Sequence, residues 1–157
     1  MYDDRILNAY LGKKEFKDKN YSENDLKSWI CCLHNEIKNI HNIKDGTVVY
    51  KGVKLKFPSD IGIGSKFYSR EFFITSPEKE ISESFVKGRN ATIMVITILN
   101  KCTNSIHNFC CDTQIFSPYP LEKEVIFTSH CSFIVADITH INNIDYISLV
   151  CEGFLFD

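Results

Sequence analysis

The sequence predicts an α+β fold in which one N-terminal helix precedes a strand-rich body. Apolar residues recur at helical spacing over residues 22–40, whereas β-branched residues and alternation dominate from residue 47 onward. The composition, with twelve Phe and seven Tyr among 157 residues, also favours sheet. This length fits a single domain over residues 1–157, with residues 1–20 as an N-terminal arm or short helix.

The helix over residues 22–40 has a clear start and a clear buried face. Ser22 is expected to be the N-cap, with Asp25 three residues later in the manner of a capping box. Leu26, Leu33 and Ile37 follow at spacings that place them on one side of the helix. A turn at 45–46, Asp followed by Gly, separates this helix from the strands.

The rest of the chain is predicted to contain strands and one short helix. That helix is expected to begin at 76–78 with Ser76 as its N-cap and Pro77 in its first turn, and to bury Ile81 and Phe85. Residues 92–99 form the strongest strand signal, and Gly153 leaves open whether the last strand is broken. The predicted strands are residues 47–50, 54–57, 66–69, 71–75, 92–99, 124–128, 131–138 and 144–156.

The charge balance disfavours several classes of partner. Eighteen basic and twenty acidic side chains give a formal net charge of −2, so no basic field for nucleic acid or an anionic membrane is expected. No apolar run approaches the roughly 20 residues of a membrane span, and no secretory signal is visible at the start. We expect a monomer that is cytoplasmic, or delivered from the cell without a visible signal peptide.

The cysteines and histidines do not match a metal site. Seven Cys, with adjacent pairs at 31–32 and 110–111, are typical of a reducing compartment rather than of a disulfide framework. Structural zinc sites need Cys separated by two to four residues, so no metal ligands are predicted. Residues 62–66 lack the length and the ending of a phosphate-binding loop, whereas a Cys/His nucleophile stays open.

The segment over residues 117–127 carries the strongest chemical signal. Two prolines and an aromatic residue precede a predicted strand that has Glu122 and Glu124 at alternate positions. Alternation would put both carboxylates on the same side, where their repulsion raises one pKa and suits acid/base or cation-stabilising work. The alternative is a charged strand entry that faces water.

In the order and spacing of three short motifs, the chain resembles the mono-ADP-ribosyltransferase family, in its Arg/Ser/Glu type with a Glu-x-Glu motif. The motifs are Tyr50-Lys51-Gly52, Ile74-Thr75-Ser76 and Glu122-Lys123-Glu124, and the likeness covers roughly residues 25–156. It implies a split β-sandwich with the substrate NAD between the two sheets. It also implies a transferase that modifies a protein side chain, most simply an exposed arginine.

The resemblance assigns a role to each matching residue. Glu124 would stabilise the ribose as the bond to nicotinamide breaks, and Glu122 would activate the acceptor. Lys51 would meet the diphosphate, beside Tyr50 and Gly52. The remaining expected contacts are Thr75 and Ser76 on the nicotinamide side and Tyr119 and Phe116 on the acceptor side.

Two residues depart from the family pattern. Lys51 stands where the family has Arg, which keeps the charge and loses the two-pronged donor fork; Arg70 is a candidate substitute. Ile74 stands where the family has Ser and so lacks a hydroxyl. Two alternatives therefore stay open: a catalytically weak NAD-binding or protein-interaction module on the same fold, and an NAD glycohydrolase.

Overall fold

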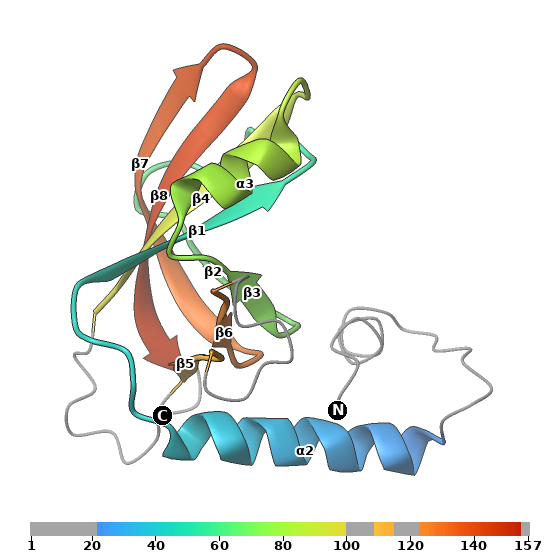
Figure 1. Ribbon diagram of the computed structural model, residues 1–157. Helices are drawn as coiled ribbons and strands as arrows, with labels where there is room; N and C mark the ends of the chain where they lie inside the picture. The colour runs from blue at the N-terminus through green and yellow to red at the C-terminus, as the bar shows by residue number, and fades with distance from the viewer. Residues whose placement is uncertain (1–21, 100–108, 115–122, 155–157) are drawn as a thin grey trace.

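The computed structural model describes residues 22–99, 109–114 and 123–154, which form two β-sheets and two helices (Figure 1). This arrangement confirms the predicted α+β class. The five-stranded sheet has the order β1 (Thr47–Val53), β4 (Ala91–Ile98), β8 (Ile144–Phe154), β7 (Cys131–Ile141) and β2 (Lys66–Tyr68). The three-stranded sheet has the order β3 (Phe73–Thr75), β6 (Val125–Phe127) and β5 (Cys110–Asp112). The helices are α2 (Glu23–Asn39) and α3 (Lys79–Val86).

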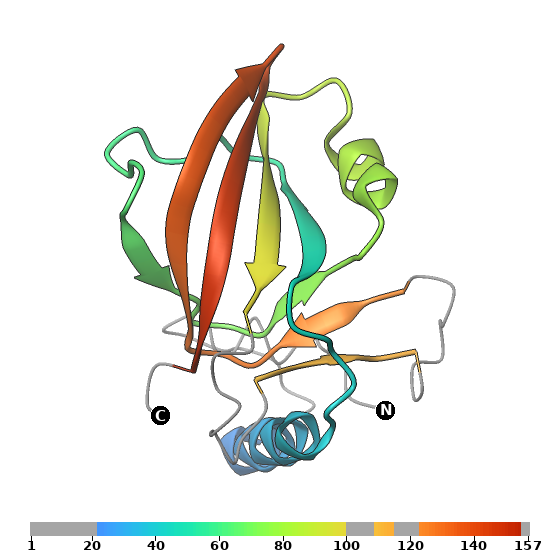
Figure 2. The ribbon, with the colours of Figure 1, turned by 90° about the vertical axis from the view of Figure 1, so that its left-hand side faces the viewer.

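Helix α2 forms as the sequence predicts. The Ser22 hydroxyl accepts the Asp25 N–H at 3.1 Å, and the Asp25 carboxylate accepts the Ser22 N–H at 3.1 Å, which completes the capping box. Leu26 and Ile37 are fully buried. They belong to a cluster with Phe72 and Ile126, so the apolar face of α2 covers the three-stranded sheet. Figure 2 shows α2 end-on beneath that sheet.

The five-stranded sheet has the last described strand at its centre. β8 pairs parallel with β4 on one side and antiparallel with β7 on the other. β7 and β8 form a long hairpin whose register shifts twice, and β8 continues through Gly153. The open question of a break at Gly153 is therefore answered, because the strand runs on to residue 154.

A strand that the sequence did not predict completes the small sheet. Cys110 and Cys111, which lie outside the predicted strands, are in β5 and pair with Phe127 and Ile126 of β6. Both thiols are buried, so the two cysteines act as small apolar core residues there. The six cysteines in the described residues carry reduced thiols.

A pair of backbone hydrogen bonds joins the two sheets. The Tyr50 N–H donates to the Ser76 carbonyl at 2.7 Å, and the Ser76 N–H donates to the Tyr50 carbonyl at 2.9 Å. The main core fills the space between the sheets around Phe127 and Phe133, whose rings lie 5.8 Å apart. The end of β3 is thus fixed beside the middle of β1.

Among the predicted strands, residues 47–50 and 54–57 differ from the structure. β1 does not end at residue 50 but continues through Gly52 to Val53, because β4 supplies a partner along its whole length. Residues 54–57 are not a strand, and Leu55 is 72% exposed. No strand of the described residues pairs with this segment, and the Leu55 carbonyl instead accepts the hydroxyl of Thr92 at 2.8 Å.

The start and the buried face of α3 also differ from the prediction. Glu78, not Ser76, is the N-cap, and the Ser76 hydroxyl instead accepts the Glu78 N–H at 3.1 Å. Ile81 and Phe85 are exposed, whereas Ser82 and Val86 are buried. The helix lies close to β1, so the smaller side chains of Ser82 and Val86 face the strand.

Gly52 is the reason that α3 can approach β1 so closely. A Cβ atom at this position would lie 2.7 Å from the Ser82 carbonyl oxygen and 2.9 Å from Val86 Cγ1. The first of these atoms is backbone, so the helix itself would have to move.

We therefore expect Gly52→Ala to lower the free energy of unfolding by about 1–3 kcal/mol, the usual cost of overpacking. Urea unfolding measures the change. Gly62→Ala is the control, because a Cβ there meets nothing within 4 Å. Equal stability of the two variants would contradict the packing role of Gly52.

Candidate functional site

Residues from the three sequence motifs meet where the two sheets join. Lys51 lies on β1, directly after the residue that pairs with Ser76. Its ammonium donates to the Ile74 carbonyl at 3.0 Å and lies 4.6 Å from the centre of the Phe73 ring. The first and second motifs are therefore in direct contact.

Lys51 is a partly buried cation with carboxylates nearby. Burial lowers the pKa of Lys51 below its ordinary value, because the charged form loses water. The charges of Glu71 and Glu124 oppose this shift. Glu124, from the third motif, therefore lies close enough to Lys51 for their charges to interact.

Glu124 has a main chain that is fixed by neighbouring segments. Its carbonyl accepts both the N–H and the hydroxyl of Thr113, at 3.0 Å and 3.1 Å. The next carbonyl, that of Val125, accepts the hydroxyl of Thr75 at 2.8 Å. Thr75 thus ties the end of β3 to the start of β6, and its hydroxyl is engaged within the protein.

Ser76 and Tyr50 contribute through their backbones as well as their side chains. Ser76 is buried, and its hydroxyl accepts the N–H of Glu78. The Tyr50 side chain is partly buried. Gly52, expected to bind the cofactor, has a packing role against α3 that needs no ligand.

The departure at Ile74 has a structural explanation. Its side chain packs against the apolar cluster under α2, while the flanking Phe73 contributes to the core between the sheets. Successive strand residues point to opposite faces, so only the carbonyl of Ile74 reaches Lys51. The side chain at this position strengthens the contact between the small sheet and α2.

The strand geometry expected for the two glutamates is wrong in part. β6 begins at Val125, not at Glu124, and Lys123 has a φ of 48°. The alternation of an extended strand therefore does not run through Lys123. Glu122, Tyr119 and Phe116 lie outside the described residues. Arg70, the candidate substitute for the family arginine, is exposed.

Sequence reasoning missed three residues of this site. Thr113 binds the Glu124 carbonyl, Glu71 interacts with Lys51 by charge, and Glu78 forms an ion pair with Lys123. No local motif marks Thr113, because its strand β5 was not predicted. Nothing in the sequence indicated the left-handed backbone of Lys123 either, since Lys is an ordinary residue at the start of a strand.

The buried cysteines are unsuited to the nucleophile that the sequence left open. Burial raises the pKa of the Cys111 thiol to about 12 and that of Cys110 further still. These thiols stay protonated at neutral pH, and only the thiolate is a strong nucleophile. Among the described residues, no group of three His, Cys, Asp or Glu side chains is arranged to hold a metal ion.

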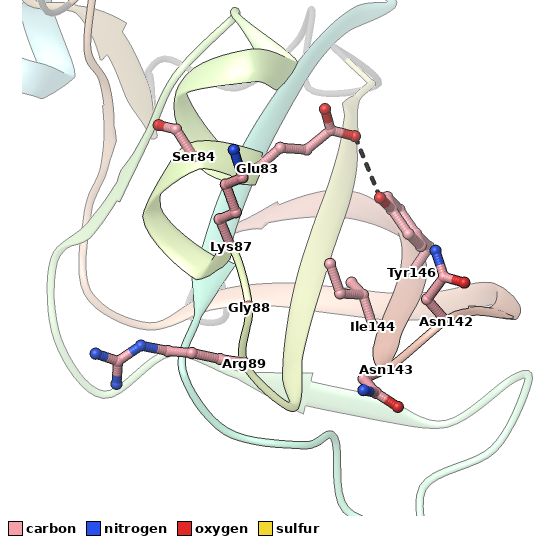
Figure 3. A pocket seen from close by; sticks show the side chains of 9 residues that line it. All are labelled: Glu83, Ser84, Lys87, Gly88, Arg89, Asn142, Asn143, Ile144 and Tyr146. Atoms are coloured by element: carbon pink, nitrogen blue, oxygen red, sulfur yellow. Dashed lines mark hydrogen bonds between the residues drawn. The ribbon is translucent and has the colours of Figure 1, made fainter.

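A surface pocket of about 500 Å³ lies away from these residues, at the far end of α3 (Figure 3). The Tyr146 hydroxyl donates to Glu83 across it at 3.2 Å. It contains none of the residues of the three motifs. Its lining is Glu83, Ser84, Lys87, Gly88, Arg89, Asn142, Asn143, Ile144 and Tyr146.

Neither α2 nor α3, the helices of the described residues, has the length and continuous apolar surface that a membrane-spanning helix needs.

Solved structures share this fold over almost the whole chain. The toxin Vis of Vibrio splendidus, an ADP-ribosyltransferase, superposes with a TM-score of 0.76 at 19% identity, over 94% of this chain and 66% of Vis. The toxin Plx2a of Paenibacillus larvae gives 0.69 at 14% identity, over 96% of this chain and 81% of Plx2a. HopU1 of Pseudomonas syringae superposes with a TM-score of 0.68 at 16% identity, over 94% of this chain and 64% of HopU1.

The protein therefore has the ADP-ribosyltransferase fold. The chain spans about two thirds of the length of Vis and HopU1. No family model matches the sequence, and no curated protein is significantly similar to it. The likeness is one of three-dimensional structure.

The lowered pKa of Lys51 predicts a specific pH dependence of stability. Between the lowered pKa of the folded protein and the ordinary value of 10.5, the unfolded chain binds more protons at Lys51 than the folded protein does. The contribution of Lys51 to stability therefore rises with pH in that window and is least favourable below it.

Compared with the wild type, Lys51→Met should thus be relatively most stable near pH 7 and lose this advantage toward pH 10. Urea unfolding of both proteins at several pH values measures the difference. A difference that is constant across that range would show that Lys51 is not desolvated.

Proposed function

We propose that the protein is an NAD-dependent mono-ADP-ribosyltransferase that modifies a protein side chain, with arginine as the acceptor. The observation that carries the proposal is the meeting of Lys51, the Thr75–Ser76 turn and Glu124 at the junction of two sheets in an ADP-ribosyltransferase fold. A cation, a pair of hydroxyl-bearing residues and a carboxylate fit the diphosphate, nicotinamide and ribose parts of NAD.

The lysine suits a phosphate ligand. In the part of the chain that the structure describes, its ammonium donates to the Ile74 carbonyl and lies over the Phe73 ring, and neither group carries a formal charge. A buried cation whose direct partners are neutral gains from an anion that it can contact. The diphosphate of NAD would supply that anion, and Lys51 would meet it as a point charge rather than as a fork.

The carboxylate suits a reaction in which positive charge develops on the ribose. The bond between the ribose and nicotinamide breaks, and nicotinamide leaves with the bonding electrons. Glu124 would hydrogen-bond a ribose hydroxyl and stabilise the charge by its own negative charge. Because the Glu124 backbone is held by Thr113, its carboxylate starts from a defined position.

The proposal of arginine as the acceptor rests on the chemistry of the reaction and on one structurally similar protein. Vis has been crystallised with agmatine, which ends in a guanidinium group like that of arginine. Glu122 would orient such a group and accept its proton as the nitrogen attacks the ribose. Tyr119 and Phe116 are the proposed contacts to the acceptor protein.

A second candidate function is a catalytically weak NAD-binding or protein-interaction module on the same fold. The engagement of Thr75 with Val125 and of Lys51 with Ile74 favours it, because both side chains already have partners within the protein. Nicotinamide release from NAD, measured with and without arginine-bearing acceptors, separates the transferase, the NAD glycohydrolase and the inactive module.

The two glutamates should respond differently to substitution. Glu124→Gln keeps the shape and removes the charge, so transfer and NAD hydrolysis should both fall by roughly 30- to 1,000-fold. Glu122→Gln should abolish transfer to arginine and spare hydrolysis by water. Glu152→Gln, on exposed strand surface, is the control and should match the wild type. Equal, small effects of both site substitutions would contradict the assignment.

Lys51 should control the affinity for NAD. Lys51→Met removes the charge and should weaken binding by about tenfold or more, since hydrogen bonds to charged groups contribute about 1.5–3 kcal/mol. Lys51→Arg should strengthen binding, because the guanidinium can contact two phosphate oxygens. Calorimetric titration with NAD measures both changes. Weaker binding by the arginine variant would mean that Lys51 does not face the diphosphate.

A further inference from the structure

Lys123, the residue between the two glutamates of the third motif, has an unusual backbone. Its φ is 48°, in the left-handed region that residues with a side chain seldom adopt. It directly precedes Glu124 and lies two residues before β6 begins. Strained backbone persists where the surroundings hold it, and such positions cluster at functional sites.

The side chain of Lys123 forms a long-range ion pair. Its ammonium contacts the Glu78 carboxylate, and the two side chains are 44% and 41% exposed. Glu78 is the N-cap residue of α3, yet its side chain makes no capping hydrogen bond to the helix. The N–H of Glu78 also donates to the Ser76 hydroxyl. The ion pair therefore ties the third motif to the turn that follows the second.

This contact complements the bonds on the other side of Glu124. Thr113 binds the Glu124 carbonyl, and Thr75 binds the carbonyl of Val125. Within the part of the chain that the structure describes, the ion pair with Glu78 is the contact that the Lys123 side chain makes. The residue is half exposed, so its pair with Glu78 contributes little to overall stability. A small displacement of a catalytic carboxylate can nevertheless cost much of its effect on rate.

We infer that Lys123 is a positioning residue: its ion pair with Glu78 fixes the left-handed turn directly before Glu124 and thereby the direction of the Glu124 side chain. The inference rests on the proposed function of Glu124. The middle residue of the Glu-x-Glu motif in this chain thus has a structural role, and Glu78 shares that role as its ion-pair partner.

The kinetic test uses nicotinamide release from NAD by the full chain. Lys123→Met and Glu78→Met should each lower kcat by about tenfold and change KM by less than about twofold, because binding groups stay in place. The double variant should be no worse than either single variant, since both remove the same contact. Lys123→Arg keeps the ion pair and should stay within about twofold of the wild type.

The control is Lys66→Met, which breaks another exposed ion pair, with Glu152, between β2 and β8. It should leave kcat and KM unchanged. Wild-type kcat in Lys123→Met, or losses that add in the double variant, would overturn the inference.

A second readout needs no NAD. The Thr113 amide donates to the Glu124 carbonyl, so its hydrogen exchange reports how firmly that residue is held. Exchange should be about two- to fivefold faster in Lys123→Met, the range expected of an exposed ion pair, and unchanged in Lys66→Met. Equal exchange in all three proteins would overturn the inference. A wild type that releases no nicotinamide would refute the proposed function alone, because the exchange measurement still decides the role of Lys123.

Discussion

The paired hydrogen bonds between Tyr50 and Ser76 are the constraint on which the rest of the site depends. They join β1 of the large sheet to the end of β3 in the small one, at 2.7 Å and 2.9 Å. The next residue after Tyr50 is Lys51, and the residue before Ser76 is Thr75. Two segments that are far apart in sequence therefore deliver a cation and a hydroxyl to one junction, and β6, paired with β3, brings Glu124 to the same place.

This junction holds a charge in partly buried surroundings, which a fold tolerates only with compensation. For Lys51 the compensation consists of one carbonyl, one aromatic face and two carboxylates that act by charge. Within the described residues, the ammonium has neutral groups as its direct contacts, and the carboxylates act on it by charge. Such incomplete compensation is typical of sites that keep binding capacity at the expense of stability.

Local signals in the sequence were enough for some features and insufficient for others. Helix α2 was predictable because its capping box and its buried leucines lie within a few turns of one another. β5 was not, because the apolar character of Cys110 and Cys111 becomes decisive only when β6 lies beside them. The order of the three motifs indicated the fold. The engagement of Thr113 and Glu78 depends on long-range contacts that no spacing records.

The central position of β8 has a consequence for how the chain reaches this structure. β4 and β7, its neighbours, precede it in sequence and have no hydrogen bonds to each other in the finished sheet. During synthesis, β4 and β7 each keep one edge without a hydrogen-bonded partner strand until residues 144–154 emerge and insert between them. Folding of the large sheet is therefore a late, non-local event, and the unpaired edges of β4 and β7 are the surfaces most exposed to misassociation before it occurs.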